Sequence, residues 1–180
     1  MRIISGTYRG KRIIAPKRLP VRPTTDMAKE SLFNILNNHY YFEEISVLDL
    51  FSGTGNISYE FASRGTKHLI AVDASAHCTS FITKTAQALN FPIKVKKMDG
   101  FKYLEKTTGR FDIIFADPPY HFDPTTFAKI SESVFKCDLS NEGGTLIIEH
   151  ADRMALDHLD YFQSKRKYGS SVFSFFENNQ

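Results

Sequence analysis

Short apolar runs alternate with longer amphipathic segments from residue 46 onward. Runs of about five apolar residues are typical of buried strands, and apolar residues at helical spacing are typical of helices that cover a sheet. Alternation of the two indicates an α/β fold, a mostly parallel sheet with helices on both faces. The expected strands are 46–50, 68–72, 93–97, 111–116 and 145–149.

The segments between the strands predict helices, and Gly65 and Pro92 mark the ends of two of them. A further helix is expected before the first strand, with Thr24, Thr25 and Asp26 as candidates for its N-cap. The positions that define these helices are Ala28, Leu32, Ile35 and Leu36, then Ile57 and Phe61, then Cys78, Phe81, Ile82, Thr85 and Leu89, and finally Phe127, Ile130 and Val134.

The two ends of the chain depart from this alternation. Residues 1–22 predict a basic β-hairpin or extended arm, since strand-like stretches are separated there by glycines and followed by prolines. Residues 161–168 and 171–176 flank Gly169-Ser170 and predict a closing antiparallel hairpin. We expect a single domain over 1–180, with the arm at 1–22 and the core at 24–180.

The composition is that of a chain that folds by itself, with 42% apolar and 24% charged residues among 180. No apolar run approaches the roughly 18 residues that span a bilayer, and the two isoleucines after Arg2 are too few for a signal peptide. Cys78 and Cys137 lie far apart and match no spacing of metal ligands. We therefore expect a cytoplasmic protein with free thiols, no metal and no membrane contact.

Positive charge is concentrated at the N-terminus. The first 22 residues contain seven basic residues and no acid, whereas the whole chain has a net charge of only +3. This asymmetry predicts that the arm contacts a polyanion such as a nucleic acid, through Arg9, Lys11 and Arg12. A solvated basic face is the alternative.

Four acids follow the expected strands. Asp49, Asp73, Asp99 and Asp117 each fall at the end of a strand or just after it. Because ligands of open α/β sheets bind beyond the carboxyl ends of the strands, these acids outline one crevice. The segment 49–55, Asp-Leu-Phe-Ser-Gly-Thr-Gly, joins the first strand to its helix, and its glycines permit a tight turn and close approach to a ligand.

The same segment indicates which cofactor binds. A dinucleotide motif requires Gly or Ala three residues after Gly55, but that residue is Ser58, and a pyrophosphate would lie beside the carboxylate of Asp49. S-adenosylmethionine has no phosphate, and carboxylates favour its sulfonium and ammonium cations. We therefore expect this cofactor to bind at Asp49, Phe51, Gly53 and Gly55.

Asp73, Asp99 and Phe101 extend the predicted cofactor site. Asp73 is expected to accept hydrogen bonds from both ribose hydroxyls. Asp99 is expected to receive the adenine amino group, with Phe101 near the ring. For Asp99, the N-cap of a helix that contains Phe101 and Leu104 is the alternative.

Asp117-Pro118-Pro119-Tyr120 follows the strand at 111–116 and can hold a flat base with an exocyclic amine. The carboxylate of Asp117 and the carbonyl of Pro118 would accept the amine hydrogens, while Tyr120 stacks on the ring. Holding this amine in line with the methyl group of a donor would provide most of the acceleration of the transfer reaction. A rigid exit from the strand is the alternative, and His121 is interpreted as a solvated loop residue.

With these motifs the chain resembles the bacterial 16S ribosomal RNA (guanine(966)-N2)-methyltransferase family, within the class I S-adenosylmethionine-dependent methyltransferases. The resemblance covers nearly the whole chain, and its specific part lies near the N-terminus. The glycine loop and the proline motif are shared by many amino-methyltransferases. The residues that carry it are 1–10 (Met-Arg-Ile-Ile-Ser-Gly-Thr-Tyr-Arg-Gly), 22–26 (Arg-Pro-Thr-Thr-Asp), 48–55 and 117–120.

The resemblance implies a Rossmann-like seven-stranded sheet, methylation of a guanine N2 amine, and a small ribosomal subunit particle as substrate. It also implies that Arg22, Thr24 and Thr25 border the cofactor and base site, with helix capping as the alternative for the threonines. Pro119, which fixes the turn, is assigned to the substrate side. Met27 and Lys29 stand where the family usually has arginine, and the missing charge at Met27 argues against a phosphate contact there.

Two other functions remain open from the residues alone. A DNA adenine-N6 methyltransferase shares the proline motif, although 180 residues leave no separate region for target recognition. A non-catalytic module that binds RNA or a nucleotide would keep the arm and the crevice without the transfer. A monomer is expected, because nothing in the sequence demands a dimer.

Overall fold

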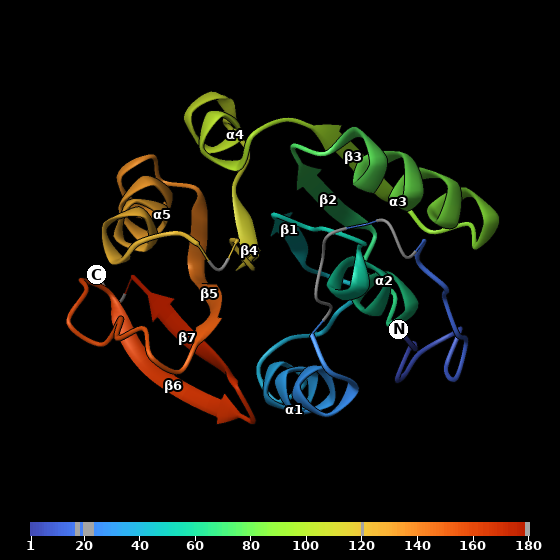
Figure 1. Ribbon diagram of the computed structural model, residues 1–180, viewed down its shortest axis with the longest axis horizontal. Coiled ribbons are helices and arrows are strands. Elements are labelled where there is room, and N and C mark those ends of the chain that lie inside the picture. The colour runs from blue at the N-terminus through green and yellow to red at the C-terminus, as the bar shows by residue number, and fades with distance from the viewer. Residues whose placement is uncertain (17–18, 20–23, 120, 179–180) are drawn as a thin grey trace.

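A computed structural model of the chain describes residues 1–16, 19, 24–119 and 121–178. Within these residues, seven strands form one sheet in the order β3-β2-β1-β4-β5-β7-β6 (Figure 1). Their bounds are β1 Ser46–Leu50, β2 His68–Asp73, β3 Ile93–Lys97, β4 Phe111–Ala116, β5 Ser140–Ala151, β6 Phe162–Tyr168 and β7 Ser171–Glu177. The first five strands pair in parallel, and β7 is antiparallel to both β5 and β6. The predicted sheet and its C-terminal hairpin are confirmed.

Helices cover both faces of this sheet (Figure 1). α1, α2 and α3 lie on one face, and α4 and α5 lie on the other. This arrangement follows from the alternation of strand and helix in the sequence. The bounds are α1 Asp26–Leu36, α2 Asn56–Ser63, α3 Ala76–Ala88, α4 Gly100–Lys106 and α5 Pro124–Lys136.

The central strands are buried on both sides, so alternate residues contribute to two separate clusters of the core. Val47 of β1 packs with Phe33 of α1 and Phe61 of α2 on one face. Leu48, its neighbour in sequence, packs with Ile130 of α5 on the other face. All five side chains are fully buried, which explains why these strands are continuous apolar runs rather than alternating ones.

The start of β5 differs from the prediction. The strand was expected from residue 145, after the two glycines at 143 and 144, but it begins at Ser140 and includes them. The pairing with β4 shifts register here, from Phe111 opposite Ser140 to Ile113 opposite Thr145. The glycines therefore accommodate an irregularity within the strand, a common position for glycine in sheets.

The N-terminal arm forms a hairpin-like loop that packs against the body of the protein. Arg2 and Arg12 make an isolated antiparallel bridge, and the N–H of Ile3 donates to the carbonyl of Lys11 over 3.0 Å. Gly6, with φ +82°, lies so close to α2 that a Cβ atom would be 1.8 Å from the carbonyl oxygen of Ser63. This contact requires glycine, because any side chain would displace the arm from α2.

A buried charged pair holds the same arm. Glu60 of α2 accepts hydrogen bonds from the backbone N–H groups of Ile4 (2.9 Å) and Ser5 (3.0 Å). The ammonium of Lys29, 1% exposed, lies 3.4 Å from Glu60 and donates to the carbonyl oxygen of Arg2 over 2.6 Å. Lys29 therefore binds the arm from inside the protein, while Met27, the other departure from the family pattern, is exposed.

Candidate active site

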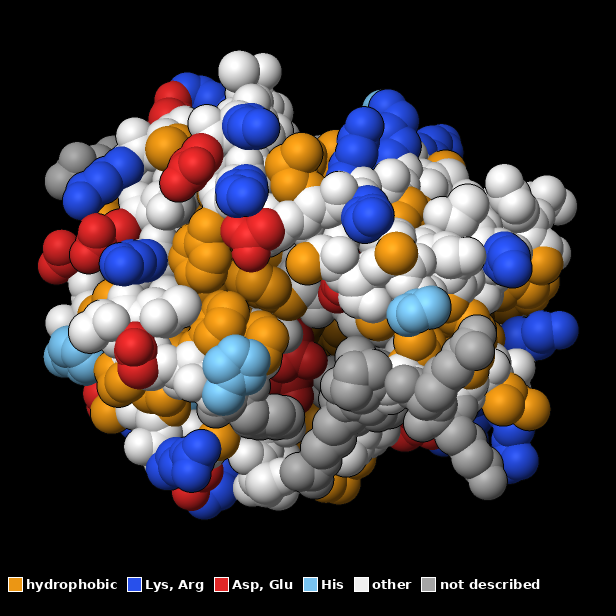
Figure 2. Space-filling view, turned by 45° about the horizontal axis from the view of Figure 1, so that its top comes forward, with side chains coloured by type: hydrophobic (Ala, Val, Ile, Leu, Met, Phe, Trp, Pro, Cys, Tyr) orange, Lys and Arg blue, Asp and Glu red, His pale blue; other side chains and the backbone are white. Residues whose placement is uncertain are grey.

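A cavity of about 550 Å³ opens at the carboxyl ends of β1 and β4. The chain leaves β1 toward β2 and leaves β4 toward β5, so the two loops diverge and leave a crevice between them. Figure 2 shows acidic side chains in this hollow, beside a group of hydrophobic side chains. Of the predicted residues that the structure describes, those that line the cavity are Thr24, Asp49, Phe51, Gly53, Asp73, Asp117, Pro118 and Pro119.

The remaining predicted residues lie around the cavity or away from it. The side chains of Thr25 and Asp99 accept N–H groups as the N-caps of α1 and α4, which were the alternatives for both. Phe101 packs edge-on against Phe51, with ring centres 6.0 Å apart. Arg9, Lys11 and Arg12 are exposed on the arm. Arg22 and Tyr120 lie outside the described residues, and the roles predicted for all these residues stay predictions.

Asp49 is the most deeply buried acid of the site, with 1% of its surface exposed. Its Oδ2 accepts the hydroxyl hydrogen of Ser58 over 2.5 Å, whereas Oδ1 has no hydrogen-bond partner within the part of the chain that the structure describes. Burial raises the pKa of Asp49 to about 7, although the Ser58 hydroxyl and backbone favour the carboxylate. A buried acceptor without a partner is costly, so this atom is suited to receive a ligand.

Asp73 organises the loop that follows β1. Its Oδ2 accepts the N–H of Gly53 and its Oδ1 accepts the N–H of Ser75, both over 2.8 Å. Each oxygen keeps a second lone pair, so the carboxylate can still accept a hydrogen bond from a ligand. Burial raises the pKa of Asp73, and the two backbone hydrogen bonds oppose that rise. Asp73 therefore fixes the glycine loop at the edge of the cavity.

Gly55 supports the loop from behind rather than from the cavity wall. It adopts φ +80° as the first residue before α2. A Cβ atom here would lie 2.9 Å from the ring of Tyr59 and 3.0 Å from Ile82. Both the backbone conformation and the lack of space therefore require glycine at this position.

Asp117 lies across the cavity, just after β4, and Glu149 lies near the end of the adjacent strand β5. Burial raises the pKa of Asp117 well above its usual range, and the charges of Glu149 and Asp49 raise it further. The Oε2 atom of Glu149 accepts the hydroxyl hydrogen of Thr24 over 2.6 Å. Three carboxyl groups thus converge on one end of the sheet.

Sequence reasoning missed several residues of this site. Glu149 ends an expected strand, and the four selected acids fall at the end of such strands or just after them, so the same signal identifies it. Ser58 was considered only as a poor match to a dinucleotide motif, yet it binds Asp49. Sequence analysis did not assign the other cavity residues to the site one by one, although Ser52 and Thr54 belong to the glycine segment: Ser52, Thr54, Asn56, Ile57, Ala74, Ser75, Cys78, Phe115 and His121.

The chemistry of the cavity matches the predicted cofactor. The Oδ1 atom of Asp49, which has no hydrogen-bond partner among the described residues, is suited to a cationic group, whereas a pyrophosphate would be repelled by the ionised forms of the surrounding acids. Among the described side chains, no three His, Cys, Asp or Glu residues are placed to hold a metal ion. No helix in the described ranges is long and apolar enough to cross a membrane.

Comparison with known proteins agrees with this geometry. Residues 1–177 match the family model described as "Conserved hypothetical protein 95". The chain belongs to this family. It is 32% identical, over 83% of its length and 82% of the relative's, to the Bacillus subtilis protein named "Putative rRNA methyltransferase YlbH". It is 30% identical to the Haemophilus influenzae "Ribosomal RNA small subunit methyltransferase D", over 68% of this chain and 65% of that one. The predicted membership of an rRNA methyltransferase family is confirmed.

Solved structures show the same fold. The Escherichia coli protein described as "Putative methyltransferase yhhF" superposes with a TM-score of 0.85 at 20% identity, over 100% of this chain and 99% of that one. A Thermus thermophilus 16S rRNA N2 methyltransferase, RsmC, in complex with AdoMet and guanosine, gives a TM-score of 0.68 at 20% identity, over 87% of this chain and 44% of that one. The Rossmann-like fold of class I methyltransferases is confirmed.

Proposed function

We propose that this protein transfers a methyl group from S-adenosylmethionine to the exocyclic N2 amine of a guanine in 16S ribosomal RNA. The proposal rests on one observation: the end of β1 and the loop after β4 line the same cavity. The end of β1 carries Asp49, whose Oδ1 atom has no hydrogen-bond partner among the described residues, and the loop after β4 presents Asp117 and two prolines. The relatives are named as a putative rRNA methyltransferase and as a ribosomal RNA small subunit methyltransferase, and these names support RNA as the substrate.

Asp49 and Asp73 account for the binding of the methyl donor. The Oδ1 atom of Asp49 would accept a hydrogen bond from the ammonium group of the donor, and the free lone pairs of Asp73 would accept its ribose hydroxyls. When bound, S-adenosylmethionine supplies an electrophilic methyl group on its sulfonium. The roles of Phe101 and Asp99 toward the adenine remain part of this proposal.

The proline motif accounts for the acceptor. The carboxylate of Asp117 and the carbonyl of Pro118 would hold the two amine hydrogens, so that the nitrogen lone pair points at the methyl carbon. The nitrogen–carbon bond forms as the carbon–sulfur bond breaks, and the amine proton leaves to Asp117 or through it to water. Burial and the charges of Glu149 and Asp49 raise the pKa of Asp117, so its ionised carboxylate is a stronger base than that of an exposed aspartate.

Labelled methyl transfer tests the proposal. Purified protein is incubated with labelled S-adenosylmethionine and either small ribosomal subunits from a strain that lacks the enzyme or duplex DNA. We expect label in the 16S RNA as N2-methylguanosine, identified and placed by mass spectrometry. Label in DNA as N6-methyladenine would support the adenine enzyme, and no transfer to any substrate would support a non-catalytic module.

A further inference from the structure

Thr24 and Glu149 form a buried hydrogen bond beside the acceptor motif, and the transfer outlined above assigns no role to this bond. Thr24 lines the cavity together with Asp117 and Pro118, and its side chain is buried. Glu149 is 2% exposed. The two residues are 125 positions apart in the sequence, so the fold itself brings them together.

The direction of this bond decides what Thr24 presents to a ligand. The hydroxyl of Thr24 donates its single hydrogen to the Oε2 atom of Glu149 over 2.6 Å. A hydroxyl oxygen whose hydrogen is used in this way can only accept a further hydrogen bond. The backbone of Thr24 is also fixed, because its carbonyl oxygen accepts the side-chain amide of Asn56 over 3.0 Å. Thr24 therefore presents an acceptor to the cavity.

Where the base would bind, the cavity is then lined by three hydrogen-bond acceptors: the carboxylate of Asp117, the carbonyl of Pro118 and the hydroxyl oxygen of Thr24. Asp117 and Pro118 suffice for the two hydrogens of any exocyclic amine. A third acceptor suits a base whose ring nitrogen next to the amine also carries a hydrogen. Guanine has this N1–H group, whereas adenine and cytosine have a lone pair at the corresponding ring nitrogen, which would face the lone pairs of Thr24.

We propose that Thr24 selects guanine at this site and that Glu149 is the positioning residue that keeps the Thr24 hydroxyl an acceptor. The inference rests on the proposed function, since it concerns which amine base is methylated. It assigns base selection to Glu149, near the end of β5, and to Thr24, two residues before α1, both outside the motif at 117–120.

The nucleobase 2-aminopurine tests this inference, because it keeps the amine of guanine but has a lone pair in place of N1–H. Small subunits are reconstituted with guanine or 2-aminopurine at the position that the labelling experiment identifies. We expect the wild-type kcat/KM to be about tenfold or more higher for guanine. In Thr24→Val, which has the same shape without the acceptor, this ratio should fall to within about threefold of one.

Two further variants separate the role of the Thr24 hydroxyl from that of Glu149. Thr24→Ser keeps the hydroxyl and should retain the wild-type ratio within about threefold. Glu149→Met removes the group that fixes the hydroxyl, so the hydroxyl can donate as well as accept, and the ratio should fall toward one. A purely structural role of Glu149 would lower both rates and leave their ratio unchanged. Circular dichroism and thermal melts monitor folding of each variant.

The outcomes separate this inference from the proposed function. If wild-type protein transfers no methyl group to either RNA, the proposed function is wrong. If it methylates guanine and 2-aminopurine equally, the proposed function stands and the selection by Thr24 is wrong. This wild-type comparison holds even where a variant does not fold. An unchanged ratio in Thr24→Val or in Glu149→Met contradicts the role given to that residue.

Discussion

At the scale of single residues, the site consists of acids placed where burial opposes their charge. Asp49, Asp73 and Asp117 all have raised pKa values, and burial is the largest cause for each. Such groups destabilise the protein when they ionise without a counter-charge. A cationic ligand supplies that charge, so the same burial that costs stability strengthens the binding of a cation.

The pKa of Asp49 predicts how cofactor binding depends on pH. Near pH 6 the free protein holds Asp49 mostly protonated, since its pKa is about 7, and a cationic ligand favours the carboxylate. Binding should therefore release a proton at low pH, and affinity should rise with pH by up to about tenfold per unit until it levels off above pH 7. Calorimetry in buffers of different ionisation enthalpy measures both effects.

Asp49→Asn is the matched variant for that titration. It should bind S-adenosylmethionine more weakly and lose most of the proton release below pH 7. Any proton release that remains in this variant would then come from another acid, such as Asp117. Full retention of the pH dependence in this variant would assign the titration to another group.

Asp117 is predicted to be essential for transfer rather than for RNA binding. Asp117→Ala should lower kcat by at least about 10²-fold, because one acceptor of the amine hydrogens and the proton acceptor are both lost. Binding of small subunits, measured by filter retention, should change little. Asp160→Asn, an exposed substitution away from the cavity, is the control. Unchanged turnover in Asp117→Ala would show that another group holds the amine.

Gly100 is predicted to control the position of Phe51. A Cβ atom at Gly100 would lie 2.7 Å from the ring of Phe51, which lines the cavity. Gly100→Ala should therefore displace that ring and weaken S-adenosylmethionine binding, even though alanine favours helix at the start of α4. Calorimetric titration measures the affinity. Gly109→Ala, where the nearest atom is 3.4 Å away, should bind like wild type.

Local patterns identified three acids of the site, but they identified neither Glu149 nor the hydrogen bonds between distant segments. Asp49, Asp73 and Asp117 follow apolar runs, and parallel strands bring such positions to one edge of a sheet. The bond between Thr24 and Glu149 could not be predicted, because it joins residues 125 positions apart and depends on where the whole fold places Thr24 relative to the end of β5. Ser58 was missed for the same reason, since its role requires the direction in which α2 leaves the glycine loop.

At the scale of elements, the arm and α2 form one unit around Glu60. This carboxylate binds two backbone N–H groups of the arm, the ammonium of Lys29 and the guanidinium of Arg64, the last over 3.0 Å. Asn56 of α2 accepts from Lys29 over 2.9 Å and donates to the carbonyl of Thr24. The arm is thus connected through buried polar contacts to a residue of the cavity wall.

Glu60 should contribute more to stability than its partner Lys29. Glu60→Met leaves the ammonium of Lys29 and two N–H groups of the arm without an acceptor, and should cost about 3–5 kcal/mol in the free energy of unfolding. Lys29→Met should cost less, because Glu60 keeps Arg64 and both N–H groups. Urea denaturation of the two variants measures the difference. Equal losses would mean that the arm contacts add little.

The elements themselves were largely predictable, with limits that have physical causes. Apolar runs located β1 and β4 at their observed ends, and a more polar run directly after Pro92 located β3. The start of β5 was misplaced because two glycines usually mark a turn, whereas here the neighbouring strand holds them in the sheet. The arm was expected as a hairpin or extended segment, and its docking on α2 depends on a contact that no local pattern encodes.

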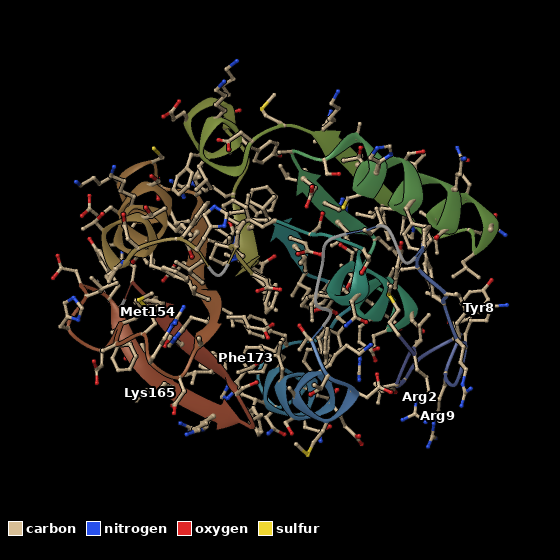
Figure 3. The ribbon with its side chains drawn as sticks, viewed as in Figure 1. Arg2, Tyr8, Arg9, Met154, Lys165 and Phe173 are labelled. Atoms are coloured by element: carbon tan, nitrogen blue, oxygen red, sulfur yellow. The ribbon has the colours of Figure 1, made fainter. Side chains whose placement is uncertain are left out.

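At the scale of the whole molecule, the basic arm and the basic strand β6 lie far apart. Arg2 and Arg9 of the arm lie on the opposite side of the molecule from Lys165 on β6 (Figure 3). On β6, Lys165 and Lys167 pair with Asp157 and Asp152, at 3.2 Å and 2.6 Å. These ion pairs neutralise part of the charge there, so the arm is the better candidate for phosphate contacts.

Replacement of Arg9, Lys11 and Arg12 by alanine should weaken binding to small subunits and lower the slope of log affinity against log salt by about 2. The matched control replaces Lys165, Arg166 and Lys167, which removes the same formal charge from the other side of the molecule. That control should leave the slope near its wild-type value. Equal effects of the two triple variants would mean that net charge, rather than a contact with the arm, controls RNA binding.

The place of β7 between β5 and β6 has a consequence for biosynthesis. Phe173 and Phe175 of β7 are buried, and this strand pairs with β5 along residues 145–151. While residues 171–177 are still inside the ribosome, β5 lacks its partner on that side, and its backbone groups remain open to any other extended chain. β6 and β7 can therefore join the sheet only after residues 171–177 have emerged, and a nascent chain that stalls before residue 171 exposes the unpaired edge of β5.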